Sequence, residues 1–507
     1  MKDNIEFPVN FIGSIAESSV FDTRKLDDIY DEIIKVYLDD SRPWVIGYSG
    51  GKDSTTALQL IWKAIEKYKS QGNDKFKDIF VIASDTLVET PAVVSHLDKN
   101  LDRIDLEAQK QELPFVVQKV RPKTNDSFWV NLIGRGYPAP TNTFRWCTDR
   151  MKIRPANDFI IEKASKFGEV VVILGVRKQE STTRAQVMSL HSKKGSLLKT
   201  HSSIPAAYVY TPIEDFSIDD VWTYLIQNKS PWGANNRDLV AMNREADGEC
   251  PLVIDKTTPS CGNGRFGCWT CTVVSEDKSM TAMIDNGADW MEPMLEFRNY
   301  IAATQNPETK LKYRSHRRRD GRITPKRESS IKKDNGEIKV DDLHNHIVPG
   351  PYELWFRKEM LEKLLETEKE VRLLGDDKKY SLIQNDELLL IRRLWMFEEN
   401  DWEDSVSKIY KDVYFKSLKI GKDDIGMFDN EDLAILSELC EEENVELDML
   451  LSLLSVERSM HGMLVRPKIH DKIERILRKD WYSKEFILEE IMKGESLEDI
   501  LVKENDI

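Results

Sequence analysis

A glycine-rich loop at residues 48–54, Tyr-Ser-Gly-Gly-Lys-Asp-Ser, directly follows the apolar run Trp44–Ile46. Its two adjacent glycines have no Cβ, so the backbone there can approach phosphate oxygens closely. The following stretch, Thr55–Lys69, is typical of a helix, and the N–H groups at its start would face the same anion. A strand, a glycine-rich loop and a helix in this order predict a pyrophosphate-binding loop. It is not a Walker A loop, because GxxxxGK[ST] is absent.

Six residues of this loop are candidates for nucleotide contact. Two serine hydroxyls and one lysine charge complement the backbone donors that would surround a phosphate. The alternative is an ordinary strand-to-helix turn in which Ser54 caps the helix. The candidate cofactor-binding residues are Ser49, Gly50, Gly51, Lys52, Asp53 and Ser54.

Short apolar runs alternate with helical periodicity in the amino-terminal part of the chain. This alternation predicts an α/β fold with a doubly wound parallel sheet, covered by helices on both faces. Ligands of such sheets bind at the carboxyl ends of the strands, where Ser49, Asp85 and the segment Gly175–Arg177 would meet. The expected strands are residues 44–48, 79–83, 115–120 and 170–174; the expected helices are 22–40, 55–69, a segment opening after Pro91, and 151–166.

The composition is that of a globular intracellular protein. Hydrophobic residues make up 40% and charged residues 32% of the 507 residues. No apolar run approaches the roughly 18 residues that span a membrane. The amino terminus lacks a basic segment followed by an apolar core, so no secretory signal is expected. We therefore expect a cytoplasmic location and no membrane partner.

Charge is distributed unevenly along the chain. The net charge of −15 argues against a protein that coats nucleic acid. Residues 310–333, which we call the basic strip, nevertheless hold eleven Lys or Arg against two Asp or Glu. Residues 431–455 hold eight Asp or Glu and no Lys or Arg. The segment Arg314–Arg319 is therefore a candidate for contact with backbone phosphates, and the alternative is a solvated loop.

The chain divides into three expected parts. Residues 1–225 form the α/β domain, and residues 226–350 form a cysteine-rich segment with little regular periodicity that includes the basic strip. Residues 351–507 show leucines at helical spacing, which predicts an α-helical carboxyl-terminal domain.

Three cysteines, Cys261, Cys268 and Cys271, lie within eleven residues among glycines that permit tight turns. In a reducing compartment, clustered thiols of this kind are typical of a metal centre. The metal is structural zinc or an iron–sulfur cluster, since spacing alone does not separate the two. The alternative is a set of unligated core thiols.

A fourth ligand would come from another cysteine. Cys147 lies just before a helix start, close in sequence to Arg145 and Arg150, and positive charge favours its thiolate. Cys440 lies in an acidic predicted helix, where carboxylates disfavour a thiolate. Cys250 is a spare thiol with no motif of its own.

Several segments together resemble one enzyme family, the phosphoadenosine phosphosulfate reductase branch of the PP-loop ATP pyrophosphatases. The resemblance covers roughly residues 40–275 and implies an adenine nucleotide alpha hydrolase-like fold and cleavage of ATP between its α- and β-phosphates. The matching segments are SGGKDS at 49–54, SDTLVET at 84–90, RWCT at 145–148, LGVRKQES at 174–181 and TPIED at 211–215. The chain departs from the reductases because it has no carboxyl-terminal catalytic cysteine, which argues against reduction of a sulfonucleotide.

The cysteine array and the long helical tail resemble the DndC proteins of bacterial DNA phosphorothioation. That resemblance implies ATP and Mg²⁺ as cofactors and a [4Fe–4S] cluster. Its implied partners are DNA, a cysteine desulfurase as sulfur donor, and other phosphorothioation proteins. The residues that match the cluster ligands are Cys147, Cys261, Cys268 and Cys271.

Four residues are the candidate catalytic groups for such chemistry. Lys52 would stabilise charge on the leaving pyrophosphate, and Asp53 or Asp85 would lie near Mg²⁺. Arg177, with Arg184, would clamp a phosphate. Three other functions stay open: a tRNA thiolation enzyme, a sulfonucleotide reductase, and a nucleotide-sensing scaffold without catalysis.

Overall fold

The computed structural model groups the chain into two compact units that interleave along the sequence. The first unit comprises Met1–Asp85, Pro91–Arg121 and Lys152–Phe266, and the second comprises Thr86–Thr90, Pro122–Met151 and Gly267–Ile507. Each unit thus combines segments from more than one of the three expected sequence ranges. The described residues are 19–180, 197–239, 267–307, 309–326, 333–334, 337–338, 346–420, 430–443, 445–460, 466–493, 497 and 500.

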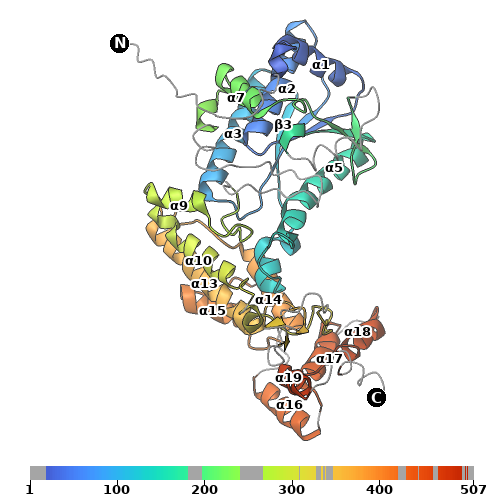
Figure 1. The fold of residues 1–507 in the computed structure, drawn as a ribbon, viewed down its shortest axis with the longest axis vertical. Coiled ribbons are helices and arrows are strands. Elements are labelled where there is room, and N and C mark those ends of the chain that lie inside the picture. The colour runs from blue at the N-terminus through green and yellow to red at the C-terminus, as the bar shows by residue number, and fades with distance from the viewer. Residues whose placement is uncertain are drawn as a thin grey trace. The chain divides into compact units, whose positions relative to one another are not determined.

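The first unit is built on a six-stranded sheet with the order β3-β2-β1-β4-β6-β5. All neighbouring pairs are parallel except β5 and β6, which run antiparallel at one edge. The predicted α/β fold with a doubly wound sheet is confirmed (Figure 1). The strands are β1 (Trp44–Gly47), β2 (Ile79–Ser84), β3 (Phe115–Val120), β4 (Val170–Ile173), β5 (Lys199–Thr200) and β6 (Ala207–Tyr210).

Alternate residues of each central strand enter two different cores, as the two-residue repeat of a strand requires. In β1, Trp44 and Ile46 pack into the core on one face, whereas Val45 packs into the core on the other. Helices α1, α2, α3 and α7 contribute to the first core, and α5 contributes to the second. The helices of this unit are η1 (Val20–Asp22), α1 (Leu26–Leu38), α2 (Lys52–Ser70), α3 (Pro91–Lys110), α5 (Arg154–Phe167), η5 (Lys178–Glu180) and α7 (Ile218–Gln227).

The second unit is mainly helical. Its core gathers buried residues from the segment 122–151, from α10 and from α13 and α14, which are far apart in sequence. Its helices are η2 (Thr124–Asp126), η3 (Val130–Gly134), α4 (Trp146–Thr148), α9 (Lys278–Asp285), η6 (Asp289–Met291), α10 (Glu292–Ala303), α11 (Lys310–Tyr313), α13 (Leu354–Leu374), α14 (Asn385–Glu398), α15 (Ser405–Tyr414), α16 (Asn430–Glu443), α17 (Leu447–Ser459), α18 (Ile469–Leu477) and α19 (Lys484–Met492). A short antiparallel pair, β7 (Lys333–Asp334) and β8 (Glu337–Ile338), also belongs to it, and η4 (Asp149–Ile153) spans the boundary between the units.

Element bounds agree closely with the sequence where the apolar signal is strong. Strand β3 has the expected bounds, and α2 begins at Lys52, three residues before the expected start. The segment 226–350 is more regular than expected, because α9 and α10 lie in it. These helices have only 8 and 12 residues, so their apolar spacing repeats too few times to stand out in the sequence. None of the described helices is long and apolar enough to cross a membrane.

Candidate functional site

The glycine-rich loop connects the carboxyl end of β1 to the amino terminus of α2. Gly50 has a φ of 73°, a left-handed conformation that glycine adopts without steric cost. The Ser49 and Ser54 hydroxyl oxygens lie 2.9 Å apart, and the Ser54 hydroxyl also donates to the Gly51 carbonyl at 3.1 Å. The Gly51 N–H donates to the Ser49 hydroxyl at 3.2 Å. The two serines therefore fix the loop shape, so that the amino terminus of α2 faces the carboxyl edge of the sheet.

The loop lies at the topological switch point of the sheet. From β1 the chain passes to β2 and β3 on one side, and β4 then pairs with the other side of β1. Open α/β sheets bind their ligands at such a point. Gly175 follows β4 and contacts the first turn of α2, since a Cβ there would lie 2.7 Å from the Asp53 carbonyl oxygen. Only glycine permits this approach between the two loops that flank the switch point.

Arg177, Asp53 and Lys52 form a buried ion-pair group beside the loop. Arg177 Nε donates to Asp53 Oδ1 at 2.6 Å, and Lys52 Nζ lies 3.3 Å from Asp53 Oδ2. The Arg177 and Asp53 side chains are only 6% and 8% exposed. Among the described residues, no hydrogen bond engages the two terminal nitrogens of Arg177. Asp53 thus orients a guanidinium whose terminal donors remain available to a phosphate.

Asp85 follows β2 at the same edge of the sheet. Its carboxylate accepts a 2.8 Å hydrogen bond from Arg121 Nε, and its N–H donates to the Val120 carbonyl. Ser84 and Val120 are partners in the β2–β3 register, so Asp85 and Arg121 are the next residues of the two strands. Asp85 is a candidate from the sequence, whereas Arg121 is not among the predicted residues; its signal is a charged residue directly after a predicted strand.

His96 of α3 is a second residue near the loop that is not among those predicted from the sequence. A Cβ placed on Gly50 would lie 3.7 Å from the His96 ring carbon Cδ2. Burial lowers the pKa of His96, and Asn100, one helical turn later, lies 3.1 Å from its Nε2. Nothing in the sequence distinguishes this histidine from a core residue of an amphipathic helix.

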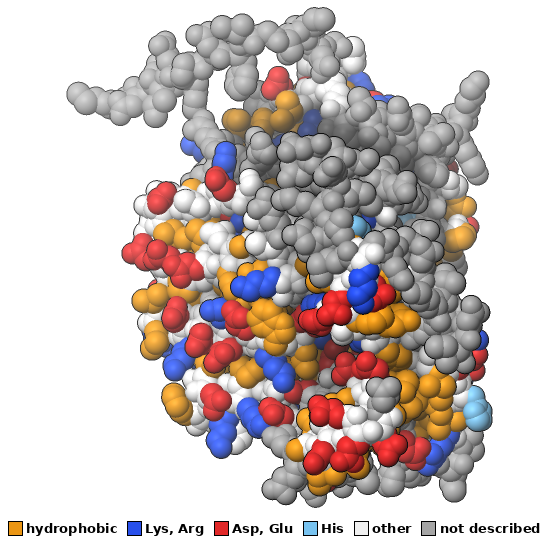
Figure 2. Space-filling model, turned by 60° about the horizontal axis from the view of Figure 1, so that its bottom comes forward, with side chains coloured by type: hydrophobic (Ala, Val, Ile, Leu, Met, Phe, Trp, Pro, Cys, Tyr) orange, Lys and Arg blue, Asp and Glu red, His pale blue; other side chains and the backbone are white. Residues whose placement is uncertain are grey.

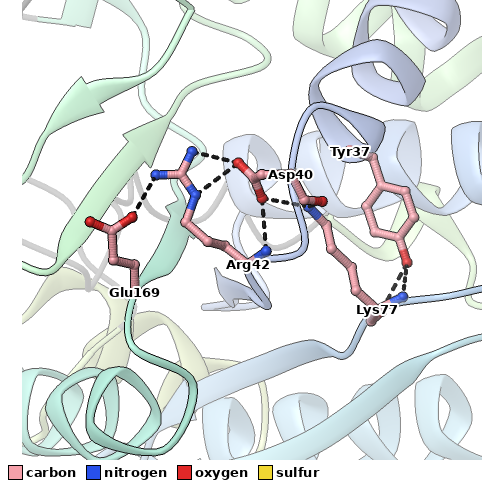
Figure 3. Close-up of polar contacts among 5 residues, drawn as sticks. All are labelled: Tyr37, Asp40, Arg42, Lys77 and Glu169. Atoms are coloured by element: carbon pink, nitrogen blue, oxygen red, sulfur yellow. Dashed lines mark hydrogen bonds and ion pairs between the residues drawn. The ribbon is translucent and has the colours of Figure 1, made fainter.

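The opposite, amino-terminal edge of the sheet carries a different charge group (Figure 3). Arg42, before β1, donates to Asp40 at 2.8 Å and to Glu169, before β4, at 3.2 Å. Lys77, before β2, lies 3.2 Å from Asp40 and over the Tyr37 ring. Burial lowers the pKa of Lys77. Each charge in this group has a nearby counter-charge, so we interpret it as structural and place the candidate site at the carboxyl edge.

The cysteines that the structure describes lie in the second unit. Cys147 and Cys268 are half-buried against the same core, and the Cys271 N–H donates to the Cys268 carbonyl at 3.1 Å in a tight turn. The Thr86 hydroxyl lies 3.5 Å from Cys268 Sγ, and Arg298 Nε donates to the Cys271 carbonyl at 2.9 Å.

The described cysteine thiols and the arginine beside them fit a thiolate-ligated metal centre. The thiols share one unit, and Arg298 places a positive charge beside Cys271. Within the described residues, however, no three potential ligand side chains come together. Cys261, Cys250 and Arg184 lie outside the described residues. The four-cysteine ligand set therefore stays a prediction.

Comparison with known proteins places the site in a family context. Residues 43–273 match the family model of the phosphoadenosine phosphosulfate reductase domain. The chain therefore carries a phosphoadenosine phosphosulfate reductase-like domain. This reductase-like domain includes the glycine-rich loop, Asp85, Arg177 and the four candidate cysteine ligands.

A curated relative and two solved structures are also similar in part. Uncharacterized protein MJ0066 of Methanocaldococcus jannaschii is 28% identical over 191 residues, which are 38% of this chain and 33% of that protein. The match thus spans about a third of the relative's length.

Two solved structures are more distant. The FMN adenylyltransferase of Candida glabrata, in complex with FAD and inorganic pyrophosphate, is 11% identical, covering 42% of this chain and 60% of its own, with a TM-score of 0.24. The U34-tRNA thiolase NcsA of Methanococcus maripaludis, with its [4Fe-4S] cluster, is 10% identical, covering 55% and 77%, with a TM-score of 0.26. At these scores neither likeness bears on the function of this chain.

Proposed function

We propose that the chain is an ATP-dependent sulfurtransferase that activates a DNA backbone phosphate and helps to replace one non-bridging oxygen by sulfur. The observation that carries the proposal is the SGGKDS loop, which lies at the switch point of the sheet beside a buried arginine. In this proposal ATP is split into AMP and pyrophosphate, and DNA phosphorothioation is the outcome.

The first step transfers the adenylyl group. A non-bridging oxygen of the DNA phosphate attacks the α-phosphorus of ATP, and the bond to pyrophosphate breaks. Backbone N–H groups of the loop, Lys52 and the terminal nitrogens of Arg177 would stabilise the negative charge that develops on pyrophosphate. Mg²⁺ would neutralise the phosphates, with Asp85 as a nearby carboxylate. Asp53 has both of its oxygens close to cations, which supports a positioning role for it.

The second step delivers sulfur. A hydrosulfide attacks the activated DNA phosphorus, loses its proton, and AMP leaves with the former non-bridging oxygen. No atom changes its oxidation state in these two steps. A [4Fe–4S] cluster held by Cys147, Cys261, Cys268 and Cys271 would supply structural support or electron transfer. We propose a cysteine desulfurase as the sulfur donor. A second thiol attacks the inner sulfur of the donor's persulfide, forms a disulfide with it and releases hydrosulfide, so that two thiols supply the two electrons. We also propose other phosphorothioation proteins as partners, and the cytoplasm, which is reducing, as the location.

The test measures the products of ATP and DNA together. The full chain, purified without oxygen, is incubated with ATP, Mg²⁺, sulfide and a DNA duplex; nucleotides are separated, and digested DNA is analysed by mass spectrometry. We expect AMP and pyrophosphate, and phosphorothioate linkages in the DNA. Release of ADP and phosphate would overturn the proposal. In parallel reactions with tRNA or a sulfonucleotide in place of DNA, thiolated nucleosides would overturn it in favour of a tRNA thiolation enzyme, and release of sulfite would identify a reductase.

A matched pair of lysine variants makes the test specific. Lys52→Ala removes the loop cation and should lower AMP formation by about 100-fold or more, as expected for a lost transition-state contact. Lys63→Ala changes the same residue type in the same helix, where Lys63 pairs with Glu66 and is 37% exposed. That variant should keep full activity.

A further inference from the structure

A cavity of about 610 Å³ lies within the second unit, whereas the glycine-rich loop belongs to the first. Its lining comes from six stretches of the sequence. They are Arg135 after η3, residues 315–321 of the basic strip, 351–357, 397–400, 448–456 of α17, and 472–481, which begins in α18. The volume is within the usual range for ligand sites, about 300–1,000 Å³. The cavity is therefore large enough to hold a ligand of several connected groups.

The lining is strongly cationic. Eight Arg or Lys residues face four carboxylates, an excess of four positive charges in a chain whose net charge is −15. The cations are Arg135, Arg317, Arg318, Arg319, Arg357, Lys472, Arg475 and Lys479, and the carboxylates are Glu353, Glu398, Glu399 and Asp448. On the molecular face that Figure 2 shows, by contrast, Lys and Arg side chains are scattered among Asp and Glu side chains. The cavity therefore concentrates positive charge more than this face does.

The structure divides the basic strip into two roles. Arg314 is structural, because it donates to the Pro349 and Gly350 carbonyls and its burial lowers its pKa to about 10. Arg317 stacks over Trp481 at 5.3 Å, and its buried Nε has no hydrogen-bond partner among the described residues. The strip is therefore not simply a solvated loop, and Arg317 has an unused donor.

Helix α18 presents its cations on one face. Lys472, Arg475 and Lys479 are spaced by three and four residues, which places them side by side along a helix and its continuation. Within the described residues, no ion pair engages Lys472 or Arg475. Arg319, another lining residue, lies 3.4 Å from Glu398, but both side chains are about half exposed, and such pairs are weak. Lys472 and Arg475 are therefore open to an anion, and Arg319 can exchange Glu398 for a stronger one.

We infer that this cavity binds consecutive phosphates of a nucleic-acid backbone. Arginine predominates in the lining, and its planar guanidinium matches the oxygens of a phosphate bidentately. Four excess charges match several linked phosphates better than a single carboxylate. The inference rests on the proposed function, since it supplies the contact that holds the DNA whose phosphate is activated.

The test compares two double variants of the full chain that change charge equally. Lys472→Ala with Arg475→Ala removes two cavity cations. Arg466→Ala with Arg478→Ala removes two cations of the same region that pair with Glu457 and Glu474 and do not line the cavity. Binding of a fluorescent DNA duplex is followed by anisotropy at 50–200 mM salt, and ATP cleavage is measured on the same samples.

The cavity variant should bind DNA about tenfold more weakly at 50 mM salt, and its slope of log affinity against log salt should be shallower by about 1.8, for two lost phosphate contacts. The control variant should match the wild type. Equal weakening in both variants, or unchanged binding in the first, overturns the inference. The inference is also overturned if the wild type binds pyrophosphate tightly, the cavity variant loses that binding, and neither protein binds DNA.

The same data separate this inference from the proposed function. Cavity-dependent DNA binding by a chain that never forms AMP would leave the inference standing and remove the proposed function. AMP formation together with DNA binding that is unchanged in the cavity variant would overturn the inference and leave the proposed function standing.

Discussion

Gly175 shows how a single residue without a Cβ holds the candidate site together. A Cβ added to Gly175 would lie within 3 Å of the Asp53 carbonyl carbon and oxygen and of the Ser54 Cα, all of which are backbone atoms. Backbone of a helix start cannot move aside as the end of a flexible side chain can. Any larger residue at position 175 must therefore displace the loop or α2.

We predict that Gly175→Ala abolishes most ATP cleavage and lowers stability by about 1–3 kcal/mol, the usual cost of overpacking. Gly168→Ala is the control: it also adds a methyl group in the loop before β4, where φ is 86° and no heavy atom lies within 4 Å. That control should cost about 1–2 kcal/mol of stability through strain but keep its turnover. Turnover is measured as pyrophosphate release and stability by thermal unfolding; equal turnover in the two variants would contradict the prediction.

The cysteines allow a second residue-level prediction. Cys268→Ser should reduce bound iron and acid-labile sulfide, because serine is a poor ligand for iron in such clusters. Cys440→Ser is the matched control, since Cys440 is buried in α16 and outside the predicted ligand set. Iron and sulfide are measured chemically on anaerobically purified protein. Unchanged iron in the first variant would show that Cys268 is not a ligand.

At the level of elements, α14 begins with a buried carboxylate. Glu387 is 2% exposed and accepts a 2.8 Å hydrogen bond from the Gln384 N–H in a capping box. Burial raises the pKa of Glu387 to about 7, although this hydrogen bond acts in the opposite direction. The helix start therefore carries a group that is protonated in the folded chain at mildly acidic pH.

The sign of the pH effect follows from this shift. A raised folded-state pKa means that the folded chain binds the proton of Glu387 more tightly than the unfolded chain does. The contribution of this carboxyl group to stability is therefore complete below about pH 4.5 and is lost as pH rises to about 7. Between pH 4.5 and pH 8, we predict that the wild type loses up to about 3 kcal/mol of stability that the Glu387→Gln variant keeps. Glu438→Gln, an exposed change in α16, should follow the wild type. Parallel unfolding curves for all three proteins across this range would contradict the prediction.

The elements also show how far the sequence leads. Apolar runs and paired glycines predicted β1–β4 and the loop, because these depend on local periodicity and on a conformation that few residues adopt. The Asp85–Arg121 pair could not be predicted, because it depends on the register between two strands. The contact between Val88 and Trp269, whose backbones hydrogen bond at 3.0 Å, joins segments that no local pattern connects.

At the scale of the whole molecule, the helical part of the second unit depends on the segment 122–151. The Trp395 indole donates to the Ile133 carbonyl at 3.1 Å, and the Arg357 guanidinium donates to the Gly134 carbonyl at 2.9 Å. A Cβ on Gly134 would lie 3.0 Å from Leu394. Trp395 and Arg357 are at most 1% exposed. A fragment of residues 351–507 would leave these groups without their partners.

We therefore predict that residues 351–507 alone form helices but no fixed tertiary structure. The fragment should bind a hydrophobic dye and unfold without a sharp thermal transition. Trp395 would be exposed, and Arg357 would keep its ion pair with Glu399 but lose the Gly134 carbonyl, and these losses cost more than the remaining contacts supply. Joining residues 122–151 through a flexible linker to residues 267–507 restores these partners and should restore a cooperative transition. Circular dichroism in the near and far ultraviolet, with dye binding, distinguishes the two states. Cooperative unfolding of 351–507 alone would show instead that the sequence-based division into three ranges describes independent domains.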